Sequence, residues 1–392
     1  MIEDARRIEQ DLNKDRKFAT KLLHFGSEID SVTGASSVPI YQASTFHHHD
    51  IFNPPQHDYS RSGNPTRQAL EDYIALLEGG TCGFAFASGM AAISTTFMLL
   101  SAGDHVIVSE DVYGGTYRLL TSILKRMNIE TTFVDMTDLN LVKEALQENT
   151  RAVYMETPSN PTLKITDVAG ITSWAQDHGL LTLLDNTFMT PYYQRPIEQG
   201  VDIVLHSATK FLGGHSDVLA GLAVARTESL GRQIKQLQNG LGTVLAPQES
   251  WLLMRGMKTL EARMAHSEKS ATKLANWLNE RNDIEAVYYP GLENHPGREV
   301  HERQSSGYGA VISFDVGSGE RAKEVLSRVR IPIVAVSLGA VESILSYPAM
   351  MSHAAMPHSV RLERGITDGL LRFSVGLEDI DDLISDLDEA LR

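Results

Sequence analysis

Short apolar runs alternate with segments of helical periodicity from about residue 65 to residue 225. Apolar runs of strand length occupy residues 83–87, 105–109, 131–135, 152–156, 180–185, 202–206 and 221–225. Helical spacing of apolar residues separates them at 68–77, 90–100, 117–127, 139–148 and 171–178. This alternation is typical of repeated βαβ units, and it predicts an α/β fold with a mainly parallel seven-stranded sheet. Right-handed crossovers between parallel strands place the following loops, and hence a ligand site, at the carboxyl edge of the sheet.

The pattern changes on both sides of this region. Residues 38–64 lack the alternation and are rich in Pro, Ser, His and Gly, which predicts an extended arm rather than a packed element. From Trp251 a long helical pattern leads into a smaller α/β region with strand candidates at 284–288, 310–314 and 371–375. A chain of 392 residues is too long for one ordinary core. We therefore predict an N-terminal arm over 1–64, a large domain over 65–254 and a small C-terminal domain over 255–392.

The composition narrows the classes of partner. The net charge of −15 disfavours nucleic acid, whose binding requires cations that neutralise phosphates. No apolar run reaches the length of a membrane span and the first residues lack the apolar region of a signal peptide, so a cytoplasmic protein without membrane contact is expected. The single cysteine, Cys82, excludes an intrachain disulfide and a thiolate metal cluster. The expected partners are a small molecule and other protein subunits.

Three consecutive histidines at residues 47–49 do not predict a metal site. Side chains alternate along an extended chain, so three neighbouring histidines cannot all face one ion. A solvated loop is the simpler interpretation, and no metal is expected.

A lysine and an aspartate that end two consecutive predicted strands carry the strongest chemical signal. Asp185 closes one apolar run and Lys210 follows the next. Pyridoxal phosphate chemistry needs an amine for a Schiff base and a carboxylate for the pyridinium nitrogen. A lysine after a strand is by itself more often an ordinary strand end, so the surrounding residues decide. Ser207 and Thr209 add hydroxyls suitable for phosphate oxygens.

Other predicted strands end at the same edge of the sheet. Ser88, Gly89 and Met90 open a helix, where free amides and the helix dipole suit a phosphate, although Ser88 is also an ordinary N-cap. Tyr113 can stack on a cofactor ring, and a structural tyrosine fits equally well. Asn160 can bond to the phenolate oxygen of the cofactor, although Asn-Pro is also a plain turn signal.

Two arginines lie outside these loops. Arg61 and Tyr59 belong to the arm, and the Arg61 guanidinium suits bidentate contact with a phosphate. Their place before the sheet suggests that they reach a site other than their own. Arg372 lies within an apolar run, where an arginine needs an anionic partner, and the carboxylate of an amino acid fits.

Taken together, six motifs resemble the Cys/Met-metabolism family of pyridoxal phosphate enzymes. They occur in the order of the family at residues 60–67, 88–92, 111–117, 156–161, 185–188 and 206–210, and the resemblance covers about residues 20–390. It implies the PLP-dependent transferase fold of type I and pyridoxal 5′-phosphate as the cofactor. It also implies a homotetramer, built as a dimer of dimers with shared active sites.

The resemblance assigns roles to individual residues. Lys210 is implied as the Schiff-base lysine, Asp185 as the partner of the pyridine nitrogen, and Tyr113 as the ring stacked on the cofactor. The remaining implied cofactor contacts are Ser88, Gly89, Met90, Asn160, Ser207 and Thr209, with Tyr59 and Arg61 of a neighbouring subunit. The implied substrate contacts are Tyr59, Tyr113, Val336, Ser337 and Arg372, of which Ser337 and Arg372 match the positions that bind the α-carboxylate.

The resemblance implies a carbon–sulfur lyase acting on a small sulfur-containing amino acid. Val336 stands where γ-acting relatives commonly carry glutamate, which favours cystathionine β-lyase, the enzyme that forms homocysteine, pyruvate and ammonia in methionine biosynthesis. Cystathionine γ-lyase, cystathionine γ-synthase and O-acetylhomoserine sulfhydrylase remain alternatives, because bacterial β-lyases with glutamate there also exist. A catalytically silent binding protein of the same fold is the alternative from a different class. A nicotinamide-binding protein is disfavoured, since no Gly-x-Gly-x-x-Gly follows the first strand.

Overall fold

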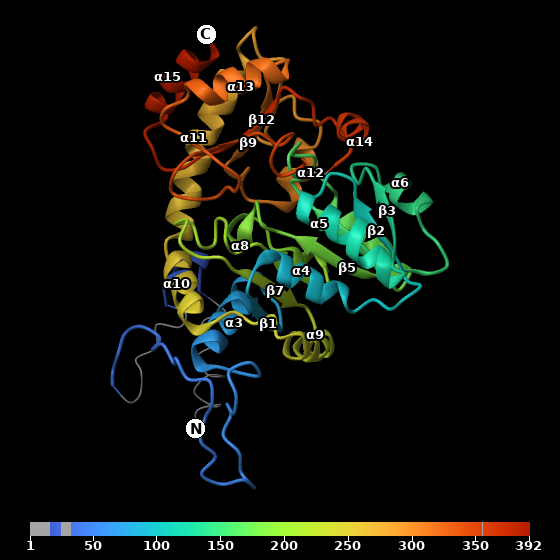
Figure 1. The fold of residues 1–392 in the computed structure, drawn as a ribbon, viewed down its shortest axis with the longest axis vertical. Helices are drawn as coiled ribbons and strands as arrows, with labels where there is room; N and C mark the ends of the chain where they lie inside the picture. Colours follow the sequence, from blue (N-terminus) through green and yellow to red (C-terminus); the bar gives the residue numbers. More distant parts are fainter. Residues whose placement is uncertain (1–15, 25–32, 355) are drawn as a thin grey trace.

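A seven-stranded sheet forms the centre of the molecule in the computed structural model, which describes residues 16–24, 33–354 and 356–392 (Figure 1). Its strands are β1 Cys82–Phe86, β2 His105–Ser109, β3 Glu130–Val134, β4 Thr150–Glu156, β5 Leu181–Asp185, β6 Ile203–His206 and β7 Gly221–Ala225. They lie in the order β1-β7-β6-β5-β4-β2-β3. The β3-β2-β4-β5-β6 pairs are parallel, and β7 runs antiparallel to β1 and β6. The predicted α/β fold class with a mainly parallel sheet is confirmed.

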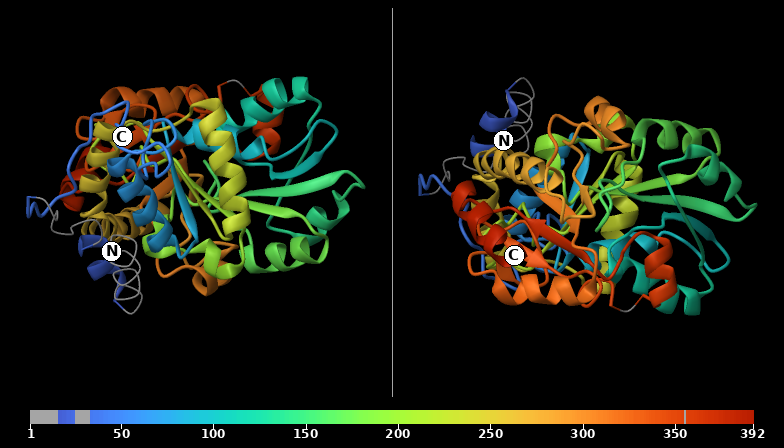
Figure 2. Two further views of the ribbon diagram at one scale, coloured as in Figure 1. Left: turned by 90° about the horizontal axis from the view of Figure 1, so that it is seen from below. Right: turned by 90° about the horizontal axis from the view of Figure 1, so that it is seen from above.

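Helices cover both faces of this sheet (Figure 2). They are α3 Pro65–Glu78, α4 Gly89–Phe97, α5 Gly114–Arg118, α6 Leu139–Glu144, α7 Val168–Asp177, α8 Thr190–Tyr193, α9 Glu228–Leu241 and α10 Pro247–Met257. Successive strand residues pack on opposite sides: Ile107 belongs to the core with α3 and α7, whereas Val106 and Val108 belong to the core with α4 and α9. Because both faces are buried, the strands are apolar along their whole length and not only at alternate positions.

A second sheet of five strands lies toward the C-terminal end. Its strands are β8 Ala286–Tyr288, β9 Val311–Asp315, β10 Ile333–Val334, β11 Ile344–Ser346 and β12 Leu370–Ser374, in the order β10-β11-β12-β9-β8. Its helices are α11 Leu260–Asn279, α12 Arg298–Gln304, α13 Gly319–Arg328, α14 His358–Glu363 and α15 Ile380–Leu391. The helical pattern that starts at Trp251 forms two helices, because α10 ends at Met257 and α11 begins at Leu260. The predicted boundary at residue 255 falls inside α10, and the division into domains stays a prediction.

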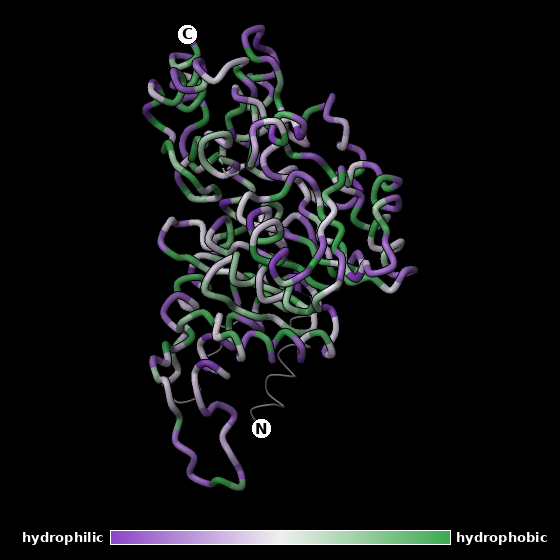
Figure 3. The backbone as a smooth tube through the Cα atoms, turned by 45° about the vertical axis from the view of Figure 1, so that its right-hand side comes forward, coloured by the Kyte–Doolittle hydropathy of each residue, from purple (hydrophilic) through white to green (hydrophobic). Residues whose placement is uncertain are grey.

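The described part of the N-terminal region contains one packed helix and one long loop. The helix α2 Phe18–His24 differs from the predicted extended arm, since Leu22 is buried and its carbonyl accepts a hydrogen bond from the hydroxyl of Tyr73 in α3. Residues 33–63 then run as a loop away from the body, mainly hydrophilic along its length (Figure 3). Residues 1–15 and 25–32 of the predicted arm lie outside the described residues. Among the described helices, none combines the length and apolar character needed to cross a membrane.

Candidate active site

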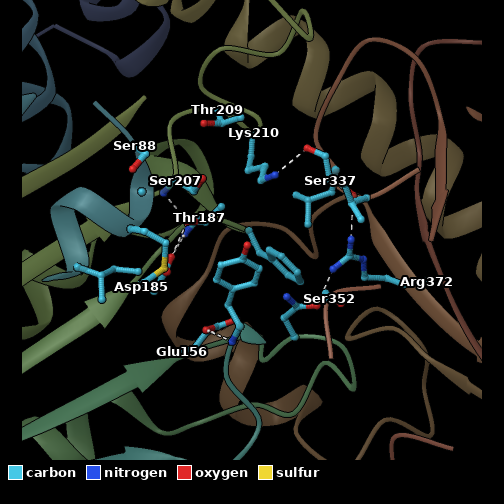
Figure 4. A pocket seen from close by; sticks show the side chains of 18 of the residues that line it. Ser88, Glu156, Asp185, Thr187, Ser207, Thr209, Lys210, Ser337, Ser352 and Arg372 are labelled. Atoms are coloured by element: carbon cyan, nitrogen blue, oxygen red, sulfur yellow. Dashed lines mark hydrogen bonds between the residues drawn. The ribbon is translucent and has the colours of Figure 1, made fainter. Parts of the chain in front are cut away.

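A cavity of about 360 Å³ opens at the carboxyl edge of the central sheet, where it meets the second sheet (Figure 4). Most residues predicted for the site line it: Ser88, Gly89, Met90, Tyr113, Asn160, Asp185, Ser207, Thr209, Lys210, Val336, Ser337 and Arg372. Residues from both ends of the chain therefore meet at the edge predicted from the strand pattern. Tyr59 and Arg61 are the two predicted residues that do not line this cavity.

Asp185 ends β5 and is fixed by neighbouring donors. The backbone N–H of Thr187 donates to its Oδ1 at 3.0 Å, and the Thr187 hydroxyl donates to the same oxygen. The Tyr154 hydroxyl donates more weakly to Oδ2, at 3.5 Å. Burial raises the pKa of Asp185, and no ion pair compensates this carboxylate within the described residues. A buried carboxylate at a cavity with no cationic partner fits the pyridinium nitrogen of pyridoxal phosphate.

Lys210 projects into the cavity from the segment after β6 (Figure 4). Its Nζ donates a hydrogen bond of 2.6 Å to the Oγ of Ser337. Burial, together with the charge of Arg372, lowers the pKa of Lys210 to about 8. An amine with this pKa is partly neutral near pH 7, as both Schiff-base formation and proton abstraction require.

The start of α4 has the properties of a phosphate site. The backbone amides of Gly89 and Met90 lie in its first turn, where no intrahelical acceptor exists. A side chain at Gly89 would place Cβ 2.9 Å from the Cβ of Ser207, so glycine permits the close approach of these two segments. The Ser88 side chain is the N-cap and accepts from the N–H of Ala91 at 3.1 Å, so the N-cap interpretation is correct and coexists with the free amides. The Thr209 hydroxyl lines the cavity but also bonds to the backbone of Ala220.

Arg372 lies buried in β12 and carries the positive charge at the other side of the cavity. Its Nη1 donates to the Oδ1 of Asn160 at 2.6 Å, and its Nη2 donates to the backbone oxygen of Ser337 at 2.8 Å. Its Nε has no hydrogen-bond partner among the described residues, and burial lowers the pKa of Arg372 to about 10. Ser337 adopts a left-handed φ of 98°, a strained conformation of the kind that concentrates at functional sites. The arrangement is suited to the carboxylate of an amino acid.

Glu156 ends β4 at this edge, and the structure connects it to Tyr113. The backbone N–H of Tyr113 donates to the Glu156 carboxylate at 3.0 Å, while Tyr113 itself is 38% exposed and lines the cavity. Burial and the neighbouring charge of Asp185 raise the pKa of Glu156 well above its usual range. Glu156 therefore anchors the turn that holds the aromatic ring.

Sequence reasoning gave no role to other residues of the cavity: Thr187 and Phe188, which belong to the 185–188 motif, and Arg118, Met351 and Ser352. A hydroxyl two residues after an aspartate is a known local bonding pattern, which is a signal that could have revealed Thr187. Arg118 and Ser352 have no such signal, because only the tertiary fold brings α5 and the segment after β11 to the cavity.

Tyr59 and Arg61 lie on the arm. Tyr59 is 47% exposed, and the centroid of its ring lies 5.5 Å from the guanidinium carbon of Arg61. A site in another subunit remains the prediction for both. The His206 side chain, at the end of β6, packs inside the protein, and its Nε2 bonds to the Glu78 carboxylate at 2.6 Å. In the part of the chain that the structure describes, no cluster of three His, Cys, Asp or Glu side chains could hold a metal ion.

The fold and this set of residues define a pyridoxal-phosphate-dependent enzyme of fold type I. The family model for the Cys/Met metabolism PLP-dependent enzymes matches residues 19–392, and the chain belongs to this family. The chain is 58% identical to cystathionine beta-lyase MetC of Bacillus subtilis strain 168, over 95% of this chain and 96% of that protein. It is 51% identical to the cystathionine gamma-lyase of the same strain, over 96% and 99%. The crystal structure of cystathionine gamma-lyase from Lactobacillus plantarum complexed with L-serine superposes with a TM-score of 0.94 at 50% identity, covering 96% of this chain and 98% of that one.

Proposed function

We propose that this protein is a carbon–sulfur lyase that cleaves cystathionine at Cβ and yields homocysteine, pyruvate and ammonia, a step of methionine biosynthesis. The observation that carries β-cleavage is the apolar opening of the cavity, where Val336 is 62% exposed. The carboxylates that line the cavity, Glu156 and Asp185, are already engaged, since Glu156 accepts from the backbone N–H of Tyr113 and Asp185 accepts from that of Thr187, so neither is placed to bind a distal amino group. The similarity to a relative named cystathionine beta-lyase supports the same assignment.

In this proposal Lys210 binds the carbonyl carbon of the cofactor, and Asp185 pairs with the ring nitrogen. When bound, pyridoxal phosphate supplies an electron sink for negative charge at the substrate Cα. Its phosphate is expected at the start of α4, near Gly89 and Ser207. Met90 and Thr209 would add contacts there.

The substrate is positioned by the opposite side of the cavity. Arg372 binds its α-carboxylate, and Asn160 and the Ser337 carbonyl keep the guanidinium in place. The Nζ of Lys210, once free, takes the proton from Cα, and its pKa of about 8 suits this transfer near neutral pH. In β-cleavage a thiolate then leaves Cβ, and Lys210 moves only this one proton from carbon.

The keto acid released from cystathionine tests the proposal. Purified holoenzyme is expected to give pyruvate as the dominant product, with homocysteine in equal amount. Coupled lactate dehydrogenase assays and mass spectrometry distinguish pyruvate from 2-oxobutanoate. Dominant 2-oxobutanoate would refute β-cleavage. Release of neither pyruvate nor 2-oxobutanoate would refute any cystathionine lyase activity.

A γ-acting enzyme is the second candidate, favoured by the 51% identity to a relative named cystathionine gamma-lyase. In that chemistry Lys210 moves a second proton, from Cβ, before the γ-substituent leaves. Its position beside Ser337 at the cavity is compatible with either proton path. Cystathionine γ-synthase and O-acetylhomoserine sulfhydrylase would use the same two proton transfers on an O-acylated homoserine, whose acyloxy group leaves Cγ before a thiol or sulfide adds there.

We further propose a homotetramer, a dimer of dimers in which the arm of one subunit completes the site of another. The support is that Tyr59 and Arg61 lie outside their own cavity and that the arm carries Ile51 and Phe52 with exposures of 75% and 92%.

A cytoplasmic location is proposed from the single free cysteine, Cys82, which suits a reducing compartment. The division into units 1–64, 65–254 and 255–392 is part of the same proposal.

Mixed oligomers test the shared site. Arg61→Ala is expected to weaken cofactor retention, and Lys210→Ala is expected to be inactive. A hybrid pair then contains one native site, so an equal random mixture is expected to recover about a quarter of wild-type activity at limiting cofactor. The two variants refolded or co-expressed together are compared with each variant alone. Activity no higher than the sum of the separate variants would contradict a shared site.

A further inference from the structure

Ser352 lines the cavity, and its hydroxyl is committed to a neighbouring side chain. Its Oγ lies 2.8 Å from the Nδ1 of His353. The other ring nitrogen of His353, Nε2, lies 3.3 Å from the backbone carbonyl oxygen of Val112. A carbonyl oxygen only accepts, so Nε2 carries the ring hydrogen. In a neutral ring Nδ1 is then the acceptor, and the Ser352 hydroxyl is the donor.

The surroundings of His353 keep the ring neutral and in place. Its side chain is 1% exposed, and its backbone N–H donates to the carbonyl of Pro348 at 3.0 Å. Burial, together with the charge of Arg372, lowers the pKa of His353 to about 4. The opposite tautomer would point the Nε2 lone pair at the Val112 oxygen. The direction of the Ser352 hydrogen bond is therefore fixed by the fold.

The segment that carries Ser352 is also pressed against the Tyr113 turn. A Cβ at Gly114 would lie only 1.9 Å from the backbone oxygen of Ser352, so the two segments are in contact at this glycine. The nearest side chain to the same point is the Nη1 of Arg118, at 3.7 Å. Arg118 is exposed, lines the cavity and forms no ion pair among the described residues. The unpaired guanidinium of Arg118 therefore lies next to Ser352, whose hydroxyl hydrogen is already donated to His353.

We propose that Ser352 is a specificity-determining residue that accepts a hydrogen bond from the ammonium group at the far end of the substrate. The hydroxyl oxygen keeps its two lone pairs for the cavity but has no proton left to offer, so it suits an N–H donor and not a carboxylate. An α-amino-acid end group satisfies both neighbours, because its carboxylate can face Arg118 while its ammonium faces Ser352. Figure 4 shows Ser352 across the cavity from Asp185, on the side of Arg372. The inference rests on the proposed function, since cystathionine has such a second amino-acid end.

The test compares cystathionine with S-(3-carboxypropyl)-L-cysteine, the same thioether without the distal amino group. For Ser352→Ala, the ratio of kcat/KM for cystathionine to kcat/KM for the analogue is expected to fall about tenfold, the loss of one hydrogen bond to a charged group. Ser352→Thr restores the hydroxyl and is expected to restore the ratio to within about threefold of wild type. A general defect in folding or in cofactor binding lowers both rates together and leaves the ratio unchanged.

The outcomes separate this inference from the proposed function. A ratio that stays at the wild-type value in Ser352→Ala, or that rises because the analogue suffers more, would overturn the acceptor role. If wild type releases 2-oxobutanoate, β-cleavage fails, and the comparison is made with S-(2-carboxyethyl)-L-homocysteine, which keeps the reacting half. The ratio then still decides whether Ser352 recognises the distal ammonium.

Discussion

Lys210→Ala is expected to abolish turnover, with kcat falling at least about 10⁴-fold, because one amine serves both as the cofactor attachment and as the base. The lysine projects into the cavity with Nζ bonded to Ser337, and the structure shows no second amine among the residues that line the cavity. Single-turnover assays with added pyridoxal phosphate measure the residual rate. The variant is also expected to lack the borohydride-trapped link to the cofactor. A residual rate within about a hundredfold of wild type would show that another group removes the proton.

The same substitution is also expected to change the free energy of unfolding of the cofactor-free protein. Burial lowers the pKa of Lys210 to about 8, from the 10.5 of an exposed lysine, so the folded state binds this proton less tightly than the unfolded chain does. The resulting penalty is fully present below pH 8 and disappears as the pH rises toward 10.5. Apo Lys210→Ala is therefore expected to be more stable than apo wild type at pH 7, by about 2 kcal/mol after allowance for its partial exposure. Urea titrations at pH 7 and pH 10 measure this difference, and equal stability at pH 7 would contradict it.

The predicted strands agree with the structure because their sequences are apolar on both faces. Strand β2 occupies the predicted residues 105–109, and both ends of β5 lie within one residue of the prediction. A strand buried on both sides is a short apolar run bounded by polar turns, a signal that needs no knowledge of its neighbours. The polar residues that follow these apolar runs include Asp185 and Lys210, and polar residues at strand ends face the carboxyl edge of a parallel sheet.

Local pattern was less informative where backbone geometry departs from a regular helix. The helix predicted at 117–127 is a short α5, then a π-helical turn over Leu119–Ile123 and a 3-10 turn over Leu124–Met127. Hydrophobic spacing does not distinguish these geometries, because they differ by a fraction of a residue per turn. The strands β10 and β11 have two and three residues, too few for a period to appear.

Site residues from the C-terminal part of the chain show the same limit. Arg372 was predicted because a charge inside an apolar run needs an explanation. Ser352 belongs to no such run, and its meaning depends on contacts with His353 and Gly114 that only the folded chain creates. A sequence motif therefore indicates the residues that bind the cofactor more readily than the residues that recognise the distal end of a substrate.

Arg372→Met is expected to raise KM for cystathionine about 10²- to 10³-fold, because two charge-assisted hydrogen bonds to the α-carboxylate are lost. Arg372 is 3% exposed, and its Nε has no protein partner among the described residues, so a donor is available to a ligand. Steady-state kinetics over a wide substrate range separate KM from kcat. A KM within about threefold of wild type would contradict the assigned role.

Arg372→Lys is the matched variant, because it keeps the charge and removes the planar fork. It is expected to recover only part of the affinity, with KM still about tenfold above wild type. One ammonium cannot bond to Asn160, to the Ser337 carbonyl and to both carboxylate oxygens in the geometry of a guanidinium. The absorbance of bound cofactor near neutral pH is expected to remain in both variants, since Arg372 forms hydrogen bonds with Asn160, Ser337 and Ser346 and none with Lys210, Asp185 or the start of α4, so that Asn160 is the one expected cofactor contact it touches. Loss of that absorbance at saturating cofactor would place Arg372 in cofactor retention instead, and a full recovery by lysine would show that charge alone, without the fork, binds the substrate.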